Sequence, residues 1–256
     1  MNDASHGTGR ADFSKVPELT LVFWIIKILA TTLGETGGDA VSMSMNLGYL
    51  VSTALFGPLF VGAVLVQIKA PKFHPVIYWI AIVASTTVGT TLADFATRSL
   101  GIGYAGGSAF LLVLLFGSLF VWKRIMGSVA IAEVSSPRSE LFYWVTIMFS
   151  QTLGTALGDW TADTAGLGYL GAAVIFSGLL ALVVAACFWT KMSRTTLFWT
   201  AFILTRPLGA VVGDFLDKPL VNGGLALSRY SASASLAVVI VALVLFLPHR
   251  AAKRSH

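Results

Sequence analysis

Apolar residues fill this chain in eight long stretches, which short polar segments separate. Each stretch holds about 20 residues, enough for an α-helix to cross a hydrocarbon core of roughly 30 Å. A transmembrane β-barrel would instead show short strands of alternating polarity. The pattern predicts an all-α, polytopic membrane protein, with spans over residues 19–43, 47–68, 76–98, 103–122, 141–163, 168–190, 196–216 and 227–247.

One frame of Trp, Gly and Asp recurs four times along these stretches. In each copy the Gly follows the Trp by ten residues and the Asp follows it by fifteen. Four copies at one spacing indicate tandem repeats. The frames are Trp24–Gly34–Asp39, Trp79–Gly89–Asp94, Trp144–Gly154–Asp159 and Trp199–Gly209–Asp214.

Each repeat is predicted to be a helical hairpin of two spans. All four hairpins then enter the membrane in the same orientation, as parallel repeats about a pseudo-symmetry axis along the membrane normal. Repeats 1 and 2 form a first half and repeats 3 and 4 a second half. The expected organisation is a disordered cytoplasmic tail over 1–18, halves over 19–122 and 141–247, a linker loop over 123–140 and a tail over 248–256.

The charged residues indicate how the chain is oriented. Only 11% of the residues are charged, against about 25% in soluble domains. Twelve of the seventeen Lys and Arg residues fall in the two tails and in the loops after spans 2, 4 and 6. By the positive-inside rule these segments face the cytoplasm, which predicts a multi-pass protein of a bacterial inner membrane with both termini cytoplasmic. The net charge of +5 is therefore attributed to orientation in the bilayer, and no nucleic-acid partner is expected.

One helical face carries the candidate chemistry. Positions 8, 11 and 15 residues after each Trp, here called offsets 8, 11 and 15, fall on nearly the same face of a helix. Three repeats place hydroxyl or carboxylate oxygens there, while repeat 4 keeps only its Asp. The candidate ion-binding residues are Thr32, Glu35, Asp39, Thr87, Thr90, Asp94, Thr152, Thr155, Asp159 and Asp214, and the four Asp are the candidate metal ligands.

Beside this face, offsets 10 and 14 are small in every repeat. A small-xxx-small pattern lets helix backbones approach closely within lipid. The first helices of the four repeats are therefore expected to pack inward against one another. The packing residues are Gly34, Gly38, Gly89, Gly154, Gly158, Gly209 and Gly213, with Ala93 at offset 14 of repeat 2.

Three basic residues are expected to compensate the buried carboxylates. Arg98 follows Asp94 by four residues, which suits an ion pair within one helix. Lys27 and Arg206 lie inside spans 1 and 7. The four Trp, near the cytoplasmic ends, are expected to form an interfacial aromatic belt or, alternatively, a gate.

The remaining motifs exclude several kinds of chemistry. All four His lie in tails or loops, and the only Cys is Cys187 in span 6, so soft metal ligands are absent from the candidate face. Carboxylate and hydroxyl oxygens suit Mg²⁺, Mn²⁺ or Ca²⁺ instead. No nucleotide-binding or hydrolytic motif occurs. We therefore expect no enzyme activity and no permanently bound cofactor.

The segments TTLGETGGD, TTVGTTLAD, QTLGTALGD and RPLGAVVGD, each following its Trp, resemble a bacterial inner-membrane family. That family consists of four tandem two-helix repeats, and its function is unknown. The resemblance covers residues 19–247 and implies the architecture but no activity. Repeat 4 departs from the pattern at Arg206-Pro207 and at Asn222-Gly223-Gly224.

The expected function is transport or export of a small inorganic cation, most readily divalent, through a site near the pseudo-symmetry axis. Close carboxylates need a cation or shared protons to coexist. The alternatives are proton-coupled transport of an anion or small organic solute, and a membrane scaffold or sensor without transport. A further alternative for the four Asp is that each caps the turn that follows it. Substrate, direction, driving ion and oligomeric state stay open at this point.

Overall fold

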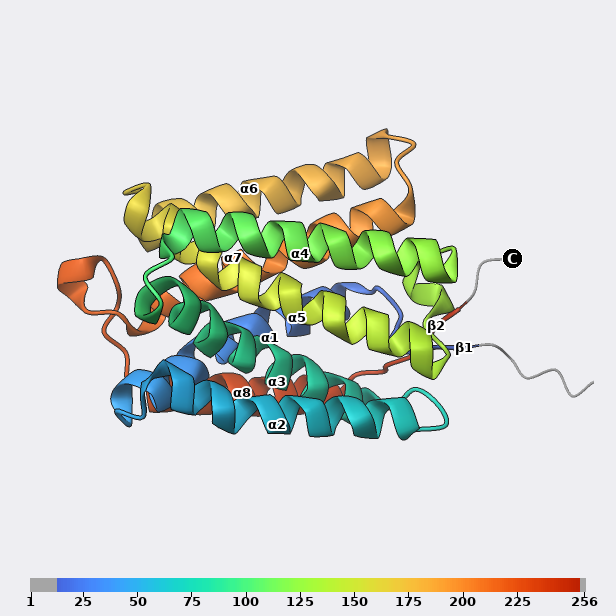
Figure 1. The fold of residues 1–256 in the computed structure, drawn as a ribbon, viewed down its shortest axis with the longest axis horizontal. Coiled ribbons are helices and arrows are strands. Elements are labelled where there is room, and N and C mark those ends of the chain that lie inside the picture. Colours follow the sequence, from blue (N-terminus) through green and yellow to red (C-terminus); the bar gives the residue numbers. More distant parts are fainter. Residues whose placement is uncertain (1–12, 254–256) are drawn as a thin grey trace, which may run out of the picture.

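The computed structural model describes residues 13–253, a helical bundle with all eight expected helices (Figure 1). Two short strands, β1 (Phe13–Pro17) and β2 (Ala251–Lys253), pair antiparallel at one end of the bundle, here called the terminal end. The opposite end is called the far end. The helices are α1 (Leu21–Asp39), α2 (Gly48–Lys69), α3 (Pro75–Asp94), α4 (Gly103–Met126), α5 (Pro137–Asp159), α6 (Gly168–Trp189), α7 (Arg194–Asp217) and α8 (Arg229–Phe246).

The four first helices of the repeats form a closed inner ring. Helix α1 packs against both α3 and α7, and α5 packs against both α3 and α7. The four second helices lie outside, each against the first helix of the following repeat: α2 on α3, α4 on α5, α6 on α7 and α8 on α1. This cyclic order joins the last repeat to the first and confirms the predicted architecture of four parallel hairpins.

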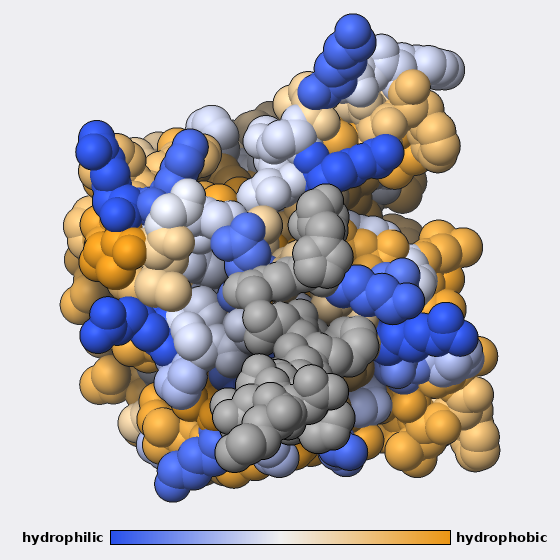
Figure 2. All heavy atoms as spheres, turned by 90° about the vertical axis from the view of Figure 1, so that its right-hand side faces the viewer, coloured by the Kyte–Doolittle hydropathy of each residue, from blue (hydrophilic) through white to orange (hydrophobic). Residues whose placement is uncertain are grey.

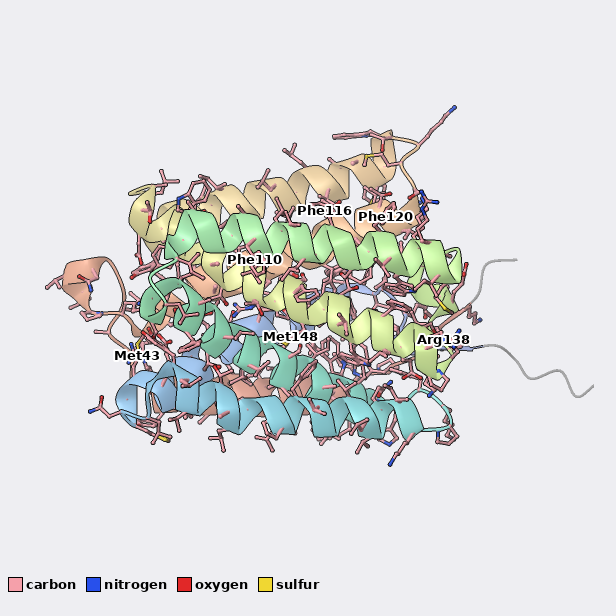
Figure 3. All side chains as sticks on the ribbon, viewed as in Figure 1. Met43, Phe110, Phe116, Phe120, Arg138 and Met148 are labelled. Atoms are coloured by element: carbon pink, nitrogen blue, oxygen red, sulfur yellow. The ribbon has the colours of Figure 1, made fainter. Side chains whose placement is uncertain are left out.

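The outer helices present apolar side chains to the surroundings. Phe110, Phe116 and Phe120 of α4 are exposed, and all three lie along that helix in Figure 3. Within the described chain, seven helices are long and apolar enough to cross a membrane. Helix α5 falls short because its inward side carries polar groups such as Thr146, Ser150 and Gln151, all buried within the ring. The chain is an all-α, polytopic membrane protein.

Small residues set the close contacts within the ring. A Cβ added at Gly34 would overlap Thr86, and one at Gly209 would overlap Thr31, the residue at the same offset of repeat 1. Gly89 and Gly154 meet Gln151 and Arg206 in the same way. In each repeat the offset-10 glycine thus packs directly against the offset-7 side chain of the following repeat, and repeat 1 follows repeat 4 in the ring. The remaining packing glycines, Gly38, Gly158 and Gly213, lie against Thr90, Ala210 and Glu35, respectively.

Repeats 1 to 3 end their first helix in a wide π-helical turn that begins just after the Asp. These turns are Ala40–Ser44, Phe95–Ser99 and Trp160–Thr164, and glycines of positive φ open the following helix. In repeat 4, α7 instead continues to Asp217 and stops before Pro219. A residue preceding proline is driven into extended backbone, as Lys218 is at ψ 152°.

The N-terminal segment differs from the disorder expected over residues 1–18, of which 1–12 lie outside the described residues. From Phe13 the chain is ordered. Ser14 and Val16 are buried, and the Ser14 hydroxyl donates to the carbonyl of Ile131 at 2.5 Å. Lys15 pairs with Glu140 at 2.6 Å. Strand β1 is held because β2, the loop before α5 and the core supply partners for its backbone and side chains.

Candidate functional site

A single side chain marks the centre of the inner ring. Arg206 of α7 is fully buried, and its Nη2 donates to Glu35 Oε2 of α1 at 3.0 Å and to Thr90 Oγ1 of α3 at 2.6 Å. The same nitrogen contacts Thr155 Oγ1 of α5. One guanidinium therefore touches all three of the other inner helices. Buried charges of this kind need such partners because an unpaired one is costly.

Toward the far end, the four repeated Asp form two bridged pairs. Arg98 lies 2.9 Å from Asp94 and 3.0 Å from Asp159. Lys218 lies 2.7 Å from Asp39 and 2.9 Å from Asp214. In both cases the cation stands at offset 19 of an even-numbered repeat and joins its own Asp to the Asp of the next repeat. The ring of four carboxylates thus has a two-fold pattern of counter-charges.

The alternative that these Asp cap their turns is not what the geometry shows. Asp39, Asp94 and Asp159 each precede a π-helical turn, and none makes a side-chain capping hydrogen bond there. All four are buried. Each of the four pairs with one of the two bridging cations described above.

Three carboxylates come closest to a cation site. One oxygen each of Glu35, Asp39 and Asp214 lies within 4.8 Å of the others. Asp39 Oδ1 is buried and accepts no hydrogen bond from any residue in the described part of the chain. Coordination at about 2.0–2.6 Å from oxygen to Mg²⁺ or Ca²⁺ places ligand oxygens up to roughly 4–5 Å apart. These residues can therefore hold one hard cation after small side-chain movements.

Repeat 4 adds a second ion pair at the edge of this cluster. Arg229, at the start of α8, lies 2.8 Å from Asp217 and 3.7 Å from Asp39.

Lys218 stands just past the end of α7. Burial lowers the pKa of its ammonium, but Asp214, Asp39 and Asp217 raise it by more, so that the pKa lies above its ordinary value. Lys218 is therefore charged between the two carboxylates that it joins.

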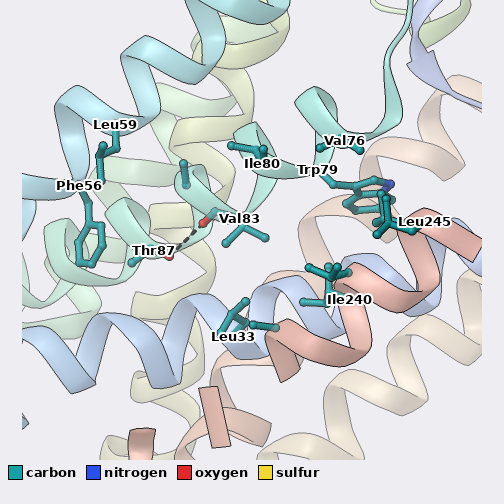
Figure 4. Close-up of a pocket in the computed structure, with 14 residues that line it drawn as sticks. Leu33, Phe56, Leu59, Val76, Trp79, Ile80, Val83, Thr87, Ile240 and Leu245 are labelled. Carbon is teal, nitrogen blue, oxygen red and sulfur yellow. Dashed lines mark hydrogen bonds between the residues drawn. The ribbon is translucent and has the colours of Figure 1, made fainter. Parts of the chain in front are cut away.

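The candidate threonines divide into two groups. Thr90 and Thr155, at offset 11, contact Arg206 at the centre. The hydroxyls at offset 8 instead donate to carbonyls four residues earlier in their own helices. Thr87 lines an apolar groove of about 480 Å³ between α1, α2, α3 and α8 (Figure 4). The three offset-8 bonds are Thr32 to Ile28, Thr87 to Val83 and Thr152 to Met148, at 3.0, 3.0 and 2.9 Å.

Offset 7 was not assigned to the candidate face, although Arg206 at this position was predicted to compensate charge. It holds Arg206 in repeat 4 and the fully buried Thr31, Thr86 and Gln151 in the others. Four residues earlier, at offset 3, Lys27 is also fully buried, and its Nζ lies 4.3 Å from the centre of the Phe202 ring. Offsets 3, 7 and 11 are four residues apart and therefore lie on one face of a helix. The polar residues at offset 7 of all four repeats were a sequence signal for this face.

Lys27 makes no ion pair with any carboxylate in the described chain, unlike Arg98 and Arg206. Its expected role in charge compensation therefore has no partner carboxylate among these residues. Arg206 and Arg98, by contrast, each pair with a candidate carboxylate.

Aromatic side chains close the ring toward the terminal end. Trp79, Trp144 and Trp199 are buried, whereas Trp24 is only half-buried. The residues just before them are also buried and aromatic. These are Phe23, Tyr78, Tyr143 and Phe198, with the hydroxyls of Tyr78 and Tyr143 2.7 Å apart. Most of the repeated Trp therefore pack inside the protein and do not form a belt facing lipid.

Comparison with known proteins gives a family but no characterised relative. A family model described as Repeat of Unknown Function (DUF347) matches residues 22–73, 77–128, 142–193 and 197–251. No curated protein and no solved structure matches the chain. The four matches coincide with the four hairpins, and the chain belongs to the DUF347 repeat family.

Proposed function

We propose that this chain is a secondary transporter of a small inorganic cation, most readily a divalent one of the Mn²⁺ or Mg²⁺ kind. The observation that supports this most strongly is the meeting of Glu35, Asp39 and Asp214 inside the bundle, with oxygens within 4.8 Å of one another. Ionisable residues at membrane depth are costly and usually mark ion pathways. The cation is the substrate, and no resident cofactor or enzymatic reaction is part of the proposal.

Lys218 gives this site a means of exchange. Its ammonium lies between Asp39 and Asp214, where it acts as a tethered cation. A divalent ion binding to the same carboxylates has to displace it. Because Lys218 follows the last residue of α7 and precedes Pro219, its side chain can turn away without unwinding the helix. Binding of the substrate cation is then coupled to dissociation of Lys218 from Asp39 and Asp214.

We take the two ends of the inner ring to act as two gates. The buried aromatic layer lies toward the terminal end, and the bridged Asp pairs lie toward the far end. Alternate opening of these gates would expose the carboxylates first to one side of the membrane and then to the other. A cation or protons must replace the lysine charge while Lys218 is displaced, because close carboxylates do not remain ionised without a counter-charge.

We further propose that the terminal end faces the cytoplasm of a bacterial inner membrane. Strands β1 and β2 pair at this end, so Phe13 and Lys253, where the described chain begins and ends, lie on the same side. Hydrophilic side chains gather on this face, between apolar sides (Figure 2). The excess of Lys and Arg in the segments on this side supports the orientation.

Flux measurements test the proposal. Purified protein is reconstituted into liposomes that enclose a dye quenched by Mn²⁺, and quenching is followed after Mn²⁺ is added outside. Asp39→Asn and Asp214→Asn should each abolish uptake. Asp163→Asn, which removes an exposed carboxylate of repeat 3, is the matched control and should transport normally. Equal rates in wild type and both site variants would overturn the proposal.

Two alternatives make different predictions in the same assay. Proton-coupled transport of an anion or organic solute is favoured by the buried Lys27 and Arg206 and would leave Mn²⁺ flux absent in wild type. A scaffold or sensor is favoured by the complete bridging of the four Asp. It would show loss of stability in the Asn variants with no flux of any tested ion.

A further inference from the structure

Basic side chains outnumber carboxylates at the middle of the inner ring. Lys27 and Arg206 are both fully buried there. Arg206 is paired with Glu35, one helical turn farther toward the far end. Lys27 has no carboxylate partner in the described chain, and its Nζ lies over the ring of Phe202, on the same helix as Arg206. With Lys27 protonated, two cations and one carboxylate leave one positive charge uncompensated, so an anion beside Lys27 would stabilise its ammonium form.

The same region contains hydrogen-bonding groups without partners. Within residues 13–253, no hydrogen bond is made by Lys27 Nζ, by Nε or Nη1 of Arg206, or by the side-chain amide of Gln151. All three side chains are fully buried. Leaving such groups unsatisfied is unfavourable, and an unpartnered charge more so. Most of these groups are donors, which is the requirement of an anion.

The positions of these groups place them around the axis. Gln151 and Arg206 occupy offset 7 of consecutive repeats, and each packs against the offset-10 glycine of the repeat before it, Gly89 or Gly154. Lys27 lies one turn toward the terminal end on α1, which packs against α7. Its ammonium lies over the ring of Phe202, an α7 residue one turn from Arg206. The donors thus come from three of the four inner helices within one turn.

We propose that Lys27, Arg206 and Gln151 form a buried binding site for a small monovalent inorganic anion of the halide class. One negative charge balances the excess cation, and the free N–H groups of the three side chains are its hydrogen-bond donors. The site lies between the aromatic layer and the carboxylate cluster; the two share no ligand, and they touch where Arg206 pairs with Glu35. It therefore goes beyond the proposed cation transport and does not depend on it.

Halide binding to the purified protein tests this site. The protein is prepared in nanodiscs in gluconate buffer with a divalent chelator, so that the carboxylate cluster does not contribute. Its thermal unfolding midpoint is then measured while bromide replaces gluconate at constant ionic strength. We expect a saturable rise in the midpoint with bromide. A midpoint that does not change, as expected if only water occupies the region, would overturn the proposal.

Variants identify the location of the binding. Lys27→Met keeps side-chain volume but removes the ammonium, and Gln151→Leu removes the amide; each should abolish the bromide response. Lys123→Met removes an exposed lysine of α4 and should retain it in full. Anomalous scattering from bromide-soaked crystals of the wild type gives a test that needs no variant. A bromide peak beside Lys27 Nζ supports the site, and peaks confined to the surface overturn it.

Failure of this proposal can be distinguished from failure of the proposed transport. Mn²⁺ binding measured in gluconate buffer without halide reports on Glu35, Asp39 and Asp214 alone. The bromide response measured with the chelator reports on Lys27, Arg206 and Gln151 alone. Either measurement can fail while the other succeeds.

Discussion

The ammonium of Lys218 lies 2.7 Å from Asp39 Oδ2, so the last repeat is joined to the first by a buried ion pair. The equivalent pair between Arg98 and Asp159 joins the second repeat to the third. Both bridges are possible because the four first helices close into a ring. They turn four equivalent carboxylates into two pairs, each with a cation between its members.

The first prediction concerns the tethered cation. Lys218→Met leaves Asp39 and Asp214 without their shared counter-charge. Without divalent ions the variant should unfold more easily, by about 3–5 kcal/mol, the usual cost of breaking a buried pair. Because the competing ammonium is gone, Mn²⁺ should bind at least about tenfold more tightly, roughly 1.4 kcal/mol. Calorimetric titration in detergent measures the affinity, and weaker Mn²⁺ binding in the variant would contradict the competition.

A second prediction compares the two bridges. Arg98 is about one-third exposed, with a side-chain exposure of 32%, whereas that of Lys218 is 11%. The ion pairs of Arg98 are better solvated and contribute less to the stability of the fold, because water screens the attraction between the charges. Arg98→Met should therefore lower the thermal unfolding midpoint less than Lys218→Met does. The opposite order would show that solvent exposure does not govern these pairs.

The third prediction concerns packing within the ring. Gly154→Ala places a methyl group against Arg206 Cγ, which cannot retreat while it contacts three helices. Overpacking of this kind typically costs about 1–3 kcal/mol. Gly117→Ala, on α4 with no neighbouring atom within 4 Å, is the matched control and should be neutral or slightly stabilising. Unfolding in detergent should separate the two; similar midpoints would contradict the close contact.

The fourth prediction concerns strand β1. Val16 is buried in the same cluster as Trp79, Trp122 and Trp144. Deletion of residues 1–17 should uncover this aromatic layer and increase quenching of tryptophan fluorescence by acrylamide. A deletion of residues 1–12, which retains β1, separates the effect of the strand from that of the preceding segment. Equal quenching in the full chain and the longer deletion would show that β1 does not shield the aromatic residues.

The repeated spacing of Trp, Gly and Asp was sufficient to predict the helices, the parallel hairpins and the inward packing of small residues. It also identified the carboxylates and the pair between Asp94 and Arg98, because both lie on one helix turn. It chose offsets 8, 11 and 15 for the polar face; offset 11 does reach the centre, but it is joined there by offsets 3 and 7 and not by offset 8. A difference of one residue rotates a side chain by about 100° around the helix, and only the packing partners decide which rotation faces the axis.

The partners of Arg206 and Lys218 depend on a different kind of information. Arg206 contacts Glu35, 171 residues away, and Lys218 contacts Asp39, 179 residues away. The four repeats become neighbours because their first helices close into a ring. The residue spacing within one repeat does not determine this order. The departure of repeat 4 from the common motif was nevertheless a signal. One of its unusual residues, Arg206, reaches Glu35 of repeat 1.

Binding of Mn²⁺ to the purified protein tests the central claim most directly. Electron paramagnetic resonance of free Mn²⁺ gives the number of ions bound per chain, measured in wild type, in the Asp39→Asn/Asp214→Asn double variant and in Asp163→Asn. The proposed site predicts one saturable Mn²⁺ ion in wild type and in Asp163→Asn, and none in the double variant. Absence of saturable binding in wild type, or undiminished binding in the double variant, would contradict it.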